Sequence, residues 1–143
     1  MNAMLTVTVF ATGTLKEAFL RDALAEYQKR LGAFCTFAVR ELPDRKPLPP
    51  LPPKAYKIAL CVEGTMLSSE QLADKLEALP NAGFSEVVFV IGGENGLDEA
   101  VKAQCDFRLS FSRMTFTHQW ARVLLAEQIY RAFTIIHHLH YHK

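Results

Sequence analysis

The sequence lacks the features that mark membrane proteins, secreted proteins and disulfide-rich proteins. It has three cysteines among 143 residues, and no apolar run comes near the roughly 20 residues of a membrane helix. Cys35, Cys61 and Cys105 are odd in number and widely spaced, which favours reduced thiols over a disulfide framework or a zinc site. The start MNAMLTVTVF lacks the basic region and cleavage site of a signal peptide. We expect one cytoplasmic domain over residues 1–143, with no membrane partner.

The chain also lacks an overall excess of charge of one sign. Its net charge is +1, with 10 Lys and Arg against 13 Asp and Glu in residues 1–100, and 6 against 2 in residues 101–143. A protein that held nucleic acid by charge alone would be more basic. A local basic site at the C-terminal end is still compatible with this distribution.

A glycine-rich stretch at Val87–Gly96, VVFVIGGENG, interrupts an apolar run. It lacks the G-x-G-x-x-G spacing of dinucleotide-binding loops and the Gly-Lys-Ser/Thr of phosphate-binding loops. The next helix opens with Asp98 and Glu99, whose carboxylates already complement the helix N-terminus. The loop therefore suits a neutral or cationic ligand, or no ligand. On these residues alone, the favoured interpretation is a strand-to-helix turn that needs glycine for its backbone angles.

Apolar periodicity and turn residues predict strands that alternate with helices. The predicted strands are Leu5–Phe10, Phe34–Leu42, Tyr56–Val62, Glu86–Ile91 and Phe107–Phe111. The predicted helices run from a capping box at Thr14–Glu17 to Gly32, from the Ser68 cap to Pro80, over Leu97–Cys105, and from His118 to about Ile136. This alternation predicts an α/β fold, a parallel-rich sheet with helices on both faces. Ligands of such sheets lie outside the carboxyl ends of the strands, where the glycine loop would be.

Two segments stand apart from this pattern. Pro43–Pro53 holds six prolines, which favours a stiff connector over a proline-rich docking ligand. In the first helix, Leu15, Phe19, Ala23, Tyr27 and Leu31 recur on one face. In the last helix, apolar residues cover more than one face, whereas a surface helix keeps a single stripe. We expect the sheet on one side of that helix and a second subunit on the other, the alternative being a central helix of one domain.

Several segments, in order along the chain, resemble the small SPOUT-class ribosomal RNA methyltransferases of the RlmH type. They are VIGGENGL, LSFSRMTFTHQ, RVLLAEQIYRAF and the terminal YHK, with KIAL and GTMLSSEQLA further upstream. The resemblance implies a C-terminal trefoil knot, a homodimer, and methylation of the N3 imide nitrogen of a pseudouridine in large-subunit ribosomal RNA. The sequence departs from the family at the Pro-rich connector, which replaces a longer, charged segment and any substrate contact made by it.

The resemblance also implies the cofactor, S-adenosyl-L-methionine, and the residues that bind it. These are Leu60, Gly92, Phe111, Ser112, Arg113, Met114, Thr115 and Phe116. The cofactor carries a sulfonium cation and no phosphate, which fits a glycine loop followed by acids. The reaction needs alignment of its partners and help in losing the imide proton, but no metal.

The polar residues of the C-terminal part supply the candidate catalytic groups. Arg122, Tyr141 and His142 are the candidates, with Arg122 placed to reach RNA phosphate and His142 as a base near neutral pH. His118 follows the cofactor segment but has a simpler interpretation as a helix cap. The tail has a simpler interpretation as a frayed end. Glu127 and Arg131 are spaced for a structural ion pair. The terminal histidines lack Cys, Asp or Glu neighbours, so we predict no metal site.

Three classes of function compete for this sequence. The favoured class is the RNA methyltransferase, acting on ribosomal RNA in the context of the ribosome. The second is a noncatalytic ribosome- or RNA-binding factor that uses the same basic end. The third, a nucleotide-dependent enzyme of the doubly wound kind, is disfavoured by the glycine spacing and by Asp98 and Glu99.

Overall fold

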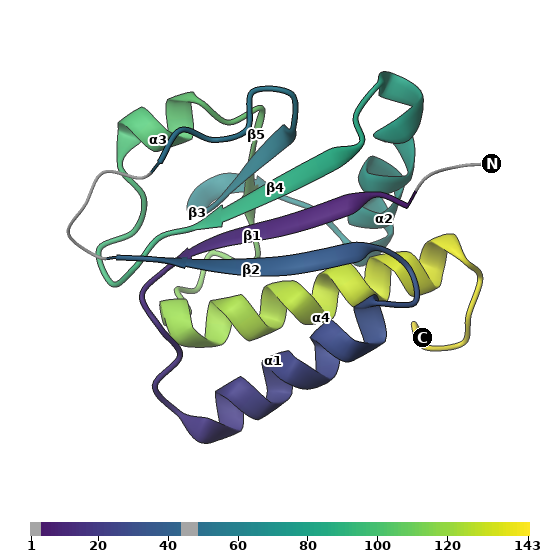
Figure 1. Ribbon diagram of the computed structural model, residues 1–143, viewed down its shortest axis with the longest axis horizontal. Helices are drawn as coiled ribbons and strands as arrows, with labels where there is room; N and C mark the ends of the chain where they lie inside the picture. The colour runs from purple at the N-terminus through teal and green to yellow at the C-terminus, as the bar shows by residue number, and fades with distance from the viewer. Residues whose placement is uncertain (1–3, 44–48) are drawn as a thin grey trace.

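A five-stranded parallel sheet forms the centre of the computed structural model, which describes residues 4–43 and 49–143. Its strands are β1 (Thr6–Thr12), β2 (Thr36–Leu42), β3 (Tyr56–Met66), β4 (Glu86–Ile91) and β5 (Phe107–Ser110). The order across the sheet is β2-β1-β4-β3-β5, shown in Figure 1. The predicted parallel α/β sheet is confirmed, and β4 has the predicted bounds. The trefoil knot stays a prediction.

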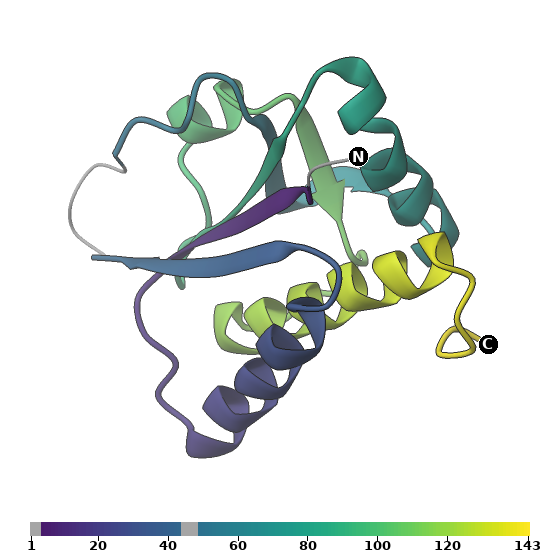
Figure 2. The same ribbon diagram turned by 45° about the vertical axis from the view of Figure 1, so that its right-hand side comes forward.

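Helices lie on both faces of the sheet, as predicted. They are α1 (Ala18–Leu31), α2 (Ser69–Ala78), α3 (Glu99–Ala103) and α4 (His118–Ile136), with a short 3₁₀ turn at Pro80–Ala82. One face buries Val7, Ile58 and Phe89 under α2 and α4. The other face buries Val88 and Val90 with Val101 of α3 and part of the connector. Figure 2 shows α3 on one side of the sheet and α1 and α4 on the other.

The start of α1 differs from the prediction. The helix begins at Ala18, and its N-cap residue Glu17 makes no side-chain capping hydrogen bond, so the predicted capping box at Thr14–Glu17 is wrong. The buried positions are Leu20, Leu24 and Leu31, while Phe19 is 56% exposed. By contrast, the Ser68 capping box of α2 is confirmed, because the Ser68 hydroxyl accepts from the Gln71 amide and the Gln71 side chain accepts in return.

The last helix, α4, is the central helix of its layer. It packs against the sheet through Leu125 and Ile129, and it contacts α1 on one flank and α2 on the other. Helices α1 and α2 of the same chain therefore cover the parts of α4 that we expected a second subunit to cover. The inference of a dimer from two-sided burial is wrong, and the homodimer rests on the family resemblance.

All five strands point the same way, so their carboxyl ends share one edge of the sheet. The glycine loop after β4, the loop from β5 to α4, and the start of α4 meet at this edge, whereas α4 carries the C-terminus to the opposite end (Figure 1). Within the described ranges, no helix is long and apolar enough to span a membrane.

Candidate active site

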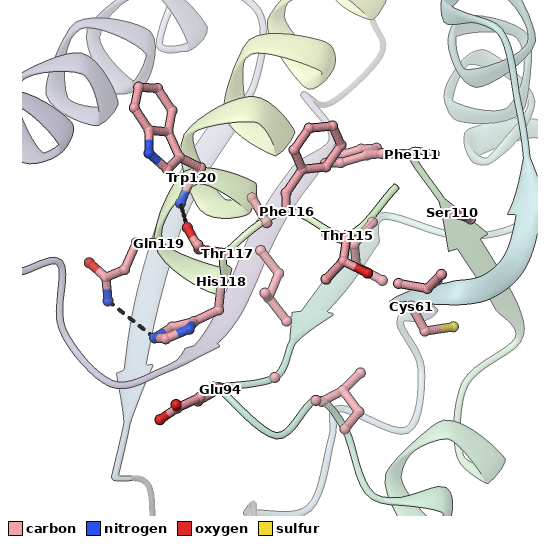
Figure 3. Close-up of a pocket in the computed structure, with 18 of the residues that line it drawn as sticks. Cys61, Glu94, Ser110, Phe111, Thr115, Phe116, Thr117, His118, Gln119 and Trp120 are labelled. Atoms are coloured by element: carbon pink, nitrogen blue, oxygen red, sulfur yellow. Dashed lines mark hydrogen bonds between the residues drawn. The ribbon is translucent and has the colours of Figure 1, made fainter. Parts of the chain in front are cut away.

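A cavity of about 820 Å³ opens at the carboxyl edge of the sheet. The ends of β3, β4 and β5, the glycine loop and the start of α4 form its walls, shown in Figure 3. The lining includes predicted cofactor-binding residues from all three segments: Leu60, Gly92, Phe111, Ser112, Met114, Thr115 and Phe116. Arg113 is exposed and is not among the lining residues. Segments that are far apart in the sequence therefore converge on one space.

A bulge in β3 adds residues that the sequence did not single out. The register with β5 shifts between Leu60 and Thr65, so the intervening residues leave the ladder. Cys61, Val62 and Glu63 thereby line the cavity. Gly64 closes the bulge against β5, where a Cβ would lie 2.7 Å from the Arg108 carbonyl carbon. Nothing in the periodicity of β3 signals this bulge, although a glycine inside a strand pattern is a known marker.

Hydroxyl groups shape the loop that joins β5 to α4. Ser110 Oγ donates to the Ser112 carbonyl oxygen at 3.0 Å, and the Met114 amide donates to Ser112 Oγ at 3.0 Å. Thr117 then caps α4, because its side chain accepts from the Trp120 amide at 3.3 Å. The cap is therefore Thr117 and not His118, and the His118 ring is left to line the cavity.

The backbone geometry of the turn requires glycine at two of its positions. Gly96 has φ +77°, a left-handed conformation that favours glycine. A Cβ on Gly92 would lie 2.3 Å from the Gly96 carbonyl carbon, so the two ends of the turn touch. The preferred interpretation from sequence, a turn that needs glycine, is confirmed, although Gly92 is required by close approach and not by its φ. The same turn is also a wall of the cavity.

Aromatic and acidic side chains give the cavity its chemical character. Phe111, Phe116 and Trp120 supply aromatic faces, and Phe19 lies against Trp120 with ring centroids 5.8 Å apart. Glu17, Glu63 and Glu94 bring three carboxylates to the lining against one ammonium, that of Lys102. Lys102 pairs with Glu63, and the hydrogen bond between them lowers the pKa of Glu63 and raises that of Lys102. Two carboxylates remain to favour a cationic ligand.

A second cavity of about 1030 Å³ lies against the first. The two share the glycine loop from Gly93 to Leu97, together with His118 and Gln119. The rest of the second cavity comes from the ends of β1 and β2 and the residues after β1, and from the start of α3: Thr12–Thr14, Lys16, Glu41–Pro43, Asp98 and Val101. Its lining is mostly polar, with both hydrogen-bond donors and acceptors.

Arg122 lies beneath this second cavity and not in it. Its side chain is 1% exposed and pairs with Glu41 at 2.7 Å. Its other terminal nitrogen donates to the carbonyl oxygens of Thr12 and Gly13 at 3.2 and 3.0 Å. The predicted contact with RNA phosphate is therefore wrong for this buried guanidinium. Arg122 instead holds three residues of the cavity wall in place.

The tail residues Tyr141 and His142 are docked on the chain's own helices, so the alternative interpretation of the tail as a frayed end is wrong. The Tyr141 hydroxyl donates to Glu127 at 3.3 Å, and its ring packs edge-on against Tyr130. Burial, followed by a hydrogen bond with Tyr27, raises the pKa of Tyr141. The predicted pair of Glu127 and Arg131 is confirmed at 2.6 Å.

His142 is held at both ring nitrogens. Arg131 can only donate, so His142 Nδ1 accepts from it at 3.1 Å. The Nε2 proton is then directed to the Glu70 carboxylate, 2.7 Å away. In this arrangement the imidazole has no free lone pair with which to act as a base. Within its own chain the tail also lies at the opposite end from the glycine loop (Figure 1).

The terminal histidines do not form a ligand set. Helix α4 ends at Ile136, and His138 has φ +57°, so no helix places His138 and His142, four residues apart, on one face. Among residues 4–43 and 49–143, no group of three or more His, Cys, Asp or Glu side chains could hold a metal ion.

Comparisons with known proteins bear on both the family and the fold. A family model described as "Predicted SPOUT methyltransferase" matches residues 5–142. The chain is 41% identical to "Ribosomal RNA large subunit methyltransferase H" of Bacillus pumilus (strain SAFR-032), over 96% of this chain and 99% of that protein. It is also similar in fold to the crystal structure of tRNA (m1G37) methyltransferase from Aquifex aeolicus. That match has a TM-score of 0.56 at 15% identity and covers 90% of this chain and 70% of the other.

Proposed function

The chain belongs to the SPOUT methyltransferase family, and from this premise we propose that it transfers a methyl group from S-adenosyl-L-methionine to the N3 nitrogen of a pseudouridine in large-subunit ribosomal RNA. The observation that carries the proposal is the convergence of Leu60, Gly92 and the Phe111–Phe116 loop on one cavity. The relative named as a ribosomal RNA large subunit methyltransferase, which aligns over nearly the whole chain, supports the choice of RNA.

The first cavity fits the cofactor by volume and by chemistry. Its volume of about 820 Å³ lies within the range of small-molecule sites. Phe111, Phe116 and Trp120 offer faces for a purine ring. Glu17 and Glu94 provide negative charge for a sulfonium and an ammonium group. Leu60, Gly92, Phe111, Ser112, Met114, Thr115 and Phe116 are therefore the proposed cofactor-binding residues.

When bound, the cofactor supplies an electrophilic methyl group attached to a good, neutral leaving group. The protein then has to align the imide nitrogen with that methyl and to favour loss of the imide proton. The aromatic residues offer surfaces for stacking, and the closely packed glycine turn forms one wall, so both features can help to align the reactants.

We further propose that the enzyme is a cytoplasmic homodimer in which Tyr141 and His142 of one subunit complete the site of the other. The tail cannot serve its own cavity, because it is docked at the far end of α4. A two-fold pair of chains could bring that end beside the partner's cavity. The modest net charge of +1 argues that recognition needs an assembled ribosomal surface and not naked RNA.

A titration followed by Trp120 fluorescence tests the cofactor first. Trp120 is the single tryptophan of the chain and lines the first cavity, so its emission should change on binding. We expect saturable binding of S-adenosylmethionine and its demethylated product, and much weaker effects of NAD or ATP. Preferential binding of NAD or ATP would refute the proposal.

Transfer of radiolabelled methyl groups to ribosomes, followed by mapping of the modified base, tests the reaction. A label on N3 of a large-subunit pseudouridine is the expected result. Ribosome binding with neither cofactor binding nor methyl transfer would instead indicate a noncatalytic RNA-binding factor.

A further inference from the structure

His118 stands on the wall between the two cavities, where a cofactor on one side and a second molecule on the other would both be within reach. It lines both cavities, as do Gln119 and the glycine loop, and Figure 3 shows His118 beside Gln119 in the first of them. The second cavity, at about 1030 Å³, is large enough for a nucleotide. A uracil-type base presents ring N–H donors and carbonyl acceptors, and the polar lining offers partners for both.

Gln119 determines which nitrogen of His118 carries the proton. The Lys16 amide donates to Gln119 Oε1 at 3.0 Å, and Gln119 Nε2 donates to the Thr14 carbonyl oxygen at 2.9 Å. These two backbone contacts fix the orientation of the amide, so its nitrogen faces His118 Nε2 at 3.3 Å. His118 Nε2 therefore accepts, and the proton resides on Nδ1. Nδ1 has no hydrogen-bond partner within the described ranges.

We propose that the second cavity receives the base of the target nucleotide, and that His118 donates from Nδ1 to a carbonyl oxygen of that base. This rests on the proposed methyltransferase function. As the imide N–H bond breaks, its proton passes to solvent water and the negative charge spreads onto the adjacent carbonyl oxygens. The new bond joins the nitrogen to the methyl carbon as the methyl–sulfur bond breaks, and its electron pair stays on sulfur. A positioned donor stabilises that developing charge.

Substitutions at His118 separate a donor from a base. His118→Ala should lower kcat about 100-fold, the effect of losing one donor to a developing oxyanion. His118→Asn retains a side-chain N–H near the Nδ1 position and should keep activity within about tenfold of the wild type. Trp120 fluorescence should report unchanged cofactor affinity in both. His137→Ala, which changes an exposed histidine packed on Phe34, is the control.

If His118 acted as a general base, His118→Asn would be as inactive as His118→Ala. That result would overturn the assignment of His118 as a hydrogen-bond donor. Wild-type activity in His118→Ala would remove His118 from the reaction. Neither result would contradict the proposed function, because the wild-type enzyme would still bind cofactor and methylate ribosomes. If the wild type does neither, the proposed function itself has failed.

Binding measured without any reaction tests the second cavity. The probe is the uncharged nucleoside pseudouridine at millimolar concentration, added to ¹⁵N-labelled protein and followed by amide NMR shifts. We expect shifts at Thr12, Gly13 and Asn95, and their loss in Thr14→Trp, which fills the second cavity from an exposed position outside the first. The Thr14 carbonyl contact with Gln119 is a backbone contact and survives this change. No shifts, or shifts confined to the first cavity, would overturn the proposal.

Discussion

At the carboxyl edge of the sheet, Gly92 combines a structural role in its turn with a proposed role in cofactor binding. A side chain there meets the Gly96 backbone before it meets any ligand. The residue is required for closure of the turn, and the turn is a wall of the cavity. A substitution at Gly92 should therefore affect stability and cofactor binding together, and not binding alone.

Gly92→Ala should displace the turn, abolish detectable cofactor binding and lower the free energy of unfolding by about 1–3 kcal/mol, the usual cost of an overpacked site. Gly32→Ala is the matched control, since Gly32 has φ −58° and its Cβ would have no neighbour closer than 3.4 Å. Denaturant melts and the Trp120 titration measure the two effects. A Gly92→Ala protein with wild-type affinity would remove the loop from the cofactor site.

The three thiols should differ in reactivity toward iodoacetamide, because the thiolate is the reactive form. Burial raises the pKa of Cys35 to about 12, so it should stay unmodified at pH 8. Burial also raises the pKa of Cys61 and of Cys105, so both should react slowly at pH 8 and faster as the pH rises. Cys61 lines the first cavity and Cys105 does not. Cofactor should therefore protect Cys61 alone, as measured by mass spectrometry, and equal protection of Cys105 would contradict the proposed site.

At the scale of elements, the sequence predicted the order and type of helices and strands because their signals are local. Alternating apolar residues, the Ser68 cap and the glycines after β4 each act within a few residues. The start of α1 was missed because Thr14 is held by Gln119, more than a hundred positions along the chain. The bulge in β3, the second cavity and the docking of Tyr141 were missed for the same reason. The proposed cofactor-binding segments came from the family resemblance, because their convergence on one cavity depends on the strand order of the sheet and not on local sequence signals.

Arg122 joins three elements, because it extends from α4 to the carboxyl ends of β1 and β2. Arg122→Met should lower the free energy of unfolding by about 2–3 kcal/mol, as one buried charge and its hydrogen bonds are lost and Glu41 keeps an unpaired charge. Arg30→Met breaks an exposed pair with Glu26 and should destabilise the fold much less, because solvent screens that pair. Urea melts of both variants measure the difference. Equal destabilisation would show that the Arg122 contacts contribute nothing beyond a surface pair.

At the scale of the whole molecule, the proposed homodimer needs a surface that a single chain leaves exposed. Exposed Trp120, Phe116 and Met114 surround the mouth of the first cavity. Large exposed apolar side chains gathered in one place mark interaction sites. Light scattering behind a sizing column should give twice the 16.1 kDa of the single chain at micromolar concentration. Trp120→Glu should shift this mass toward the monomer, whereas a monomeric wild type would refute the homodimer.

Removal of Tyr141, His142 and Lys143 tests whether the docked tail has a role in catalysis. These residues lie at the opposite end of α4 from the cavity of their own chain. Cofactor affinity should therefore be nearly unchanged after truncation. Methyl transfer to ribosomes should be abolished if the tail completes the partner's site.

Glu70→Gln is the companion variant, because it weakens the His142 contact while keeping every residue of the tail. It should bind cofactor as the wild type does and transfer methyl groups at a reduced rate, since the imidazole is held less firmly. Transfer assays on ribosomes and on naked RNA, run side by side for both variants, measure the two substrates. Full activity of the truncated protein on ribosomes would show that the tail only covers its own helix. Equal wild-type activity on naked RNA would show that no assembled ribosomal surface is required.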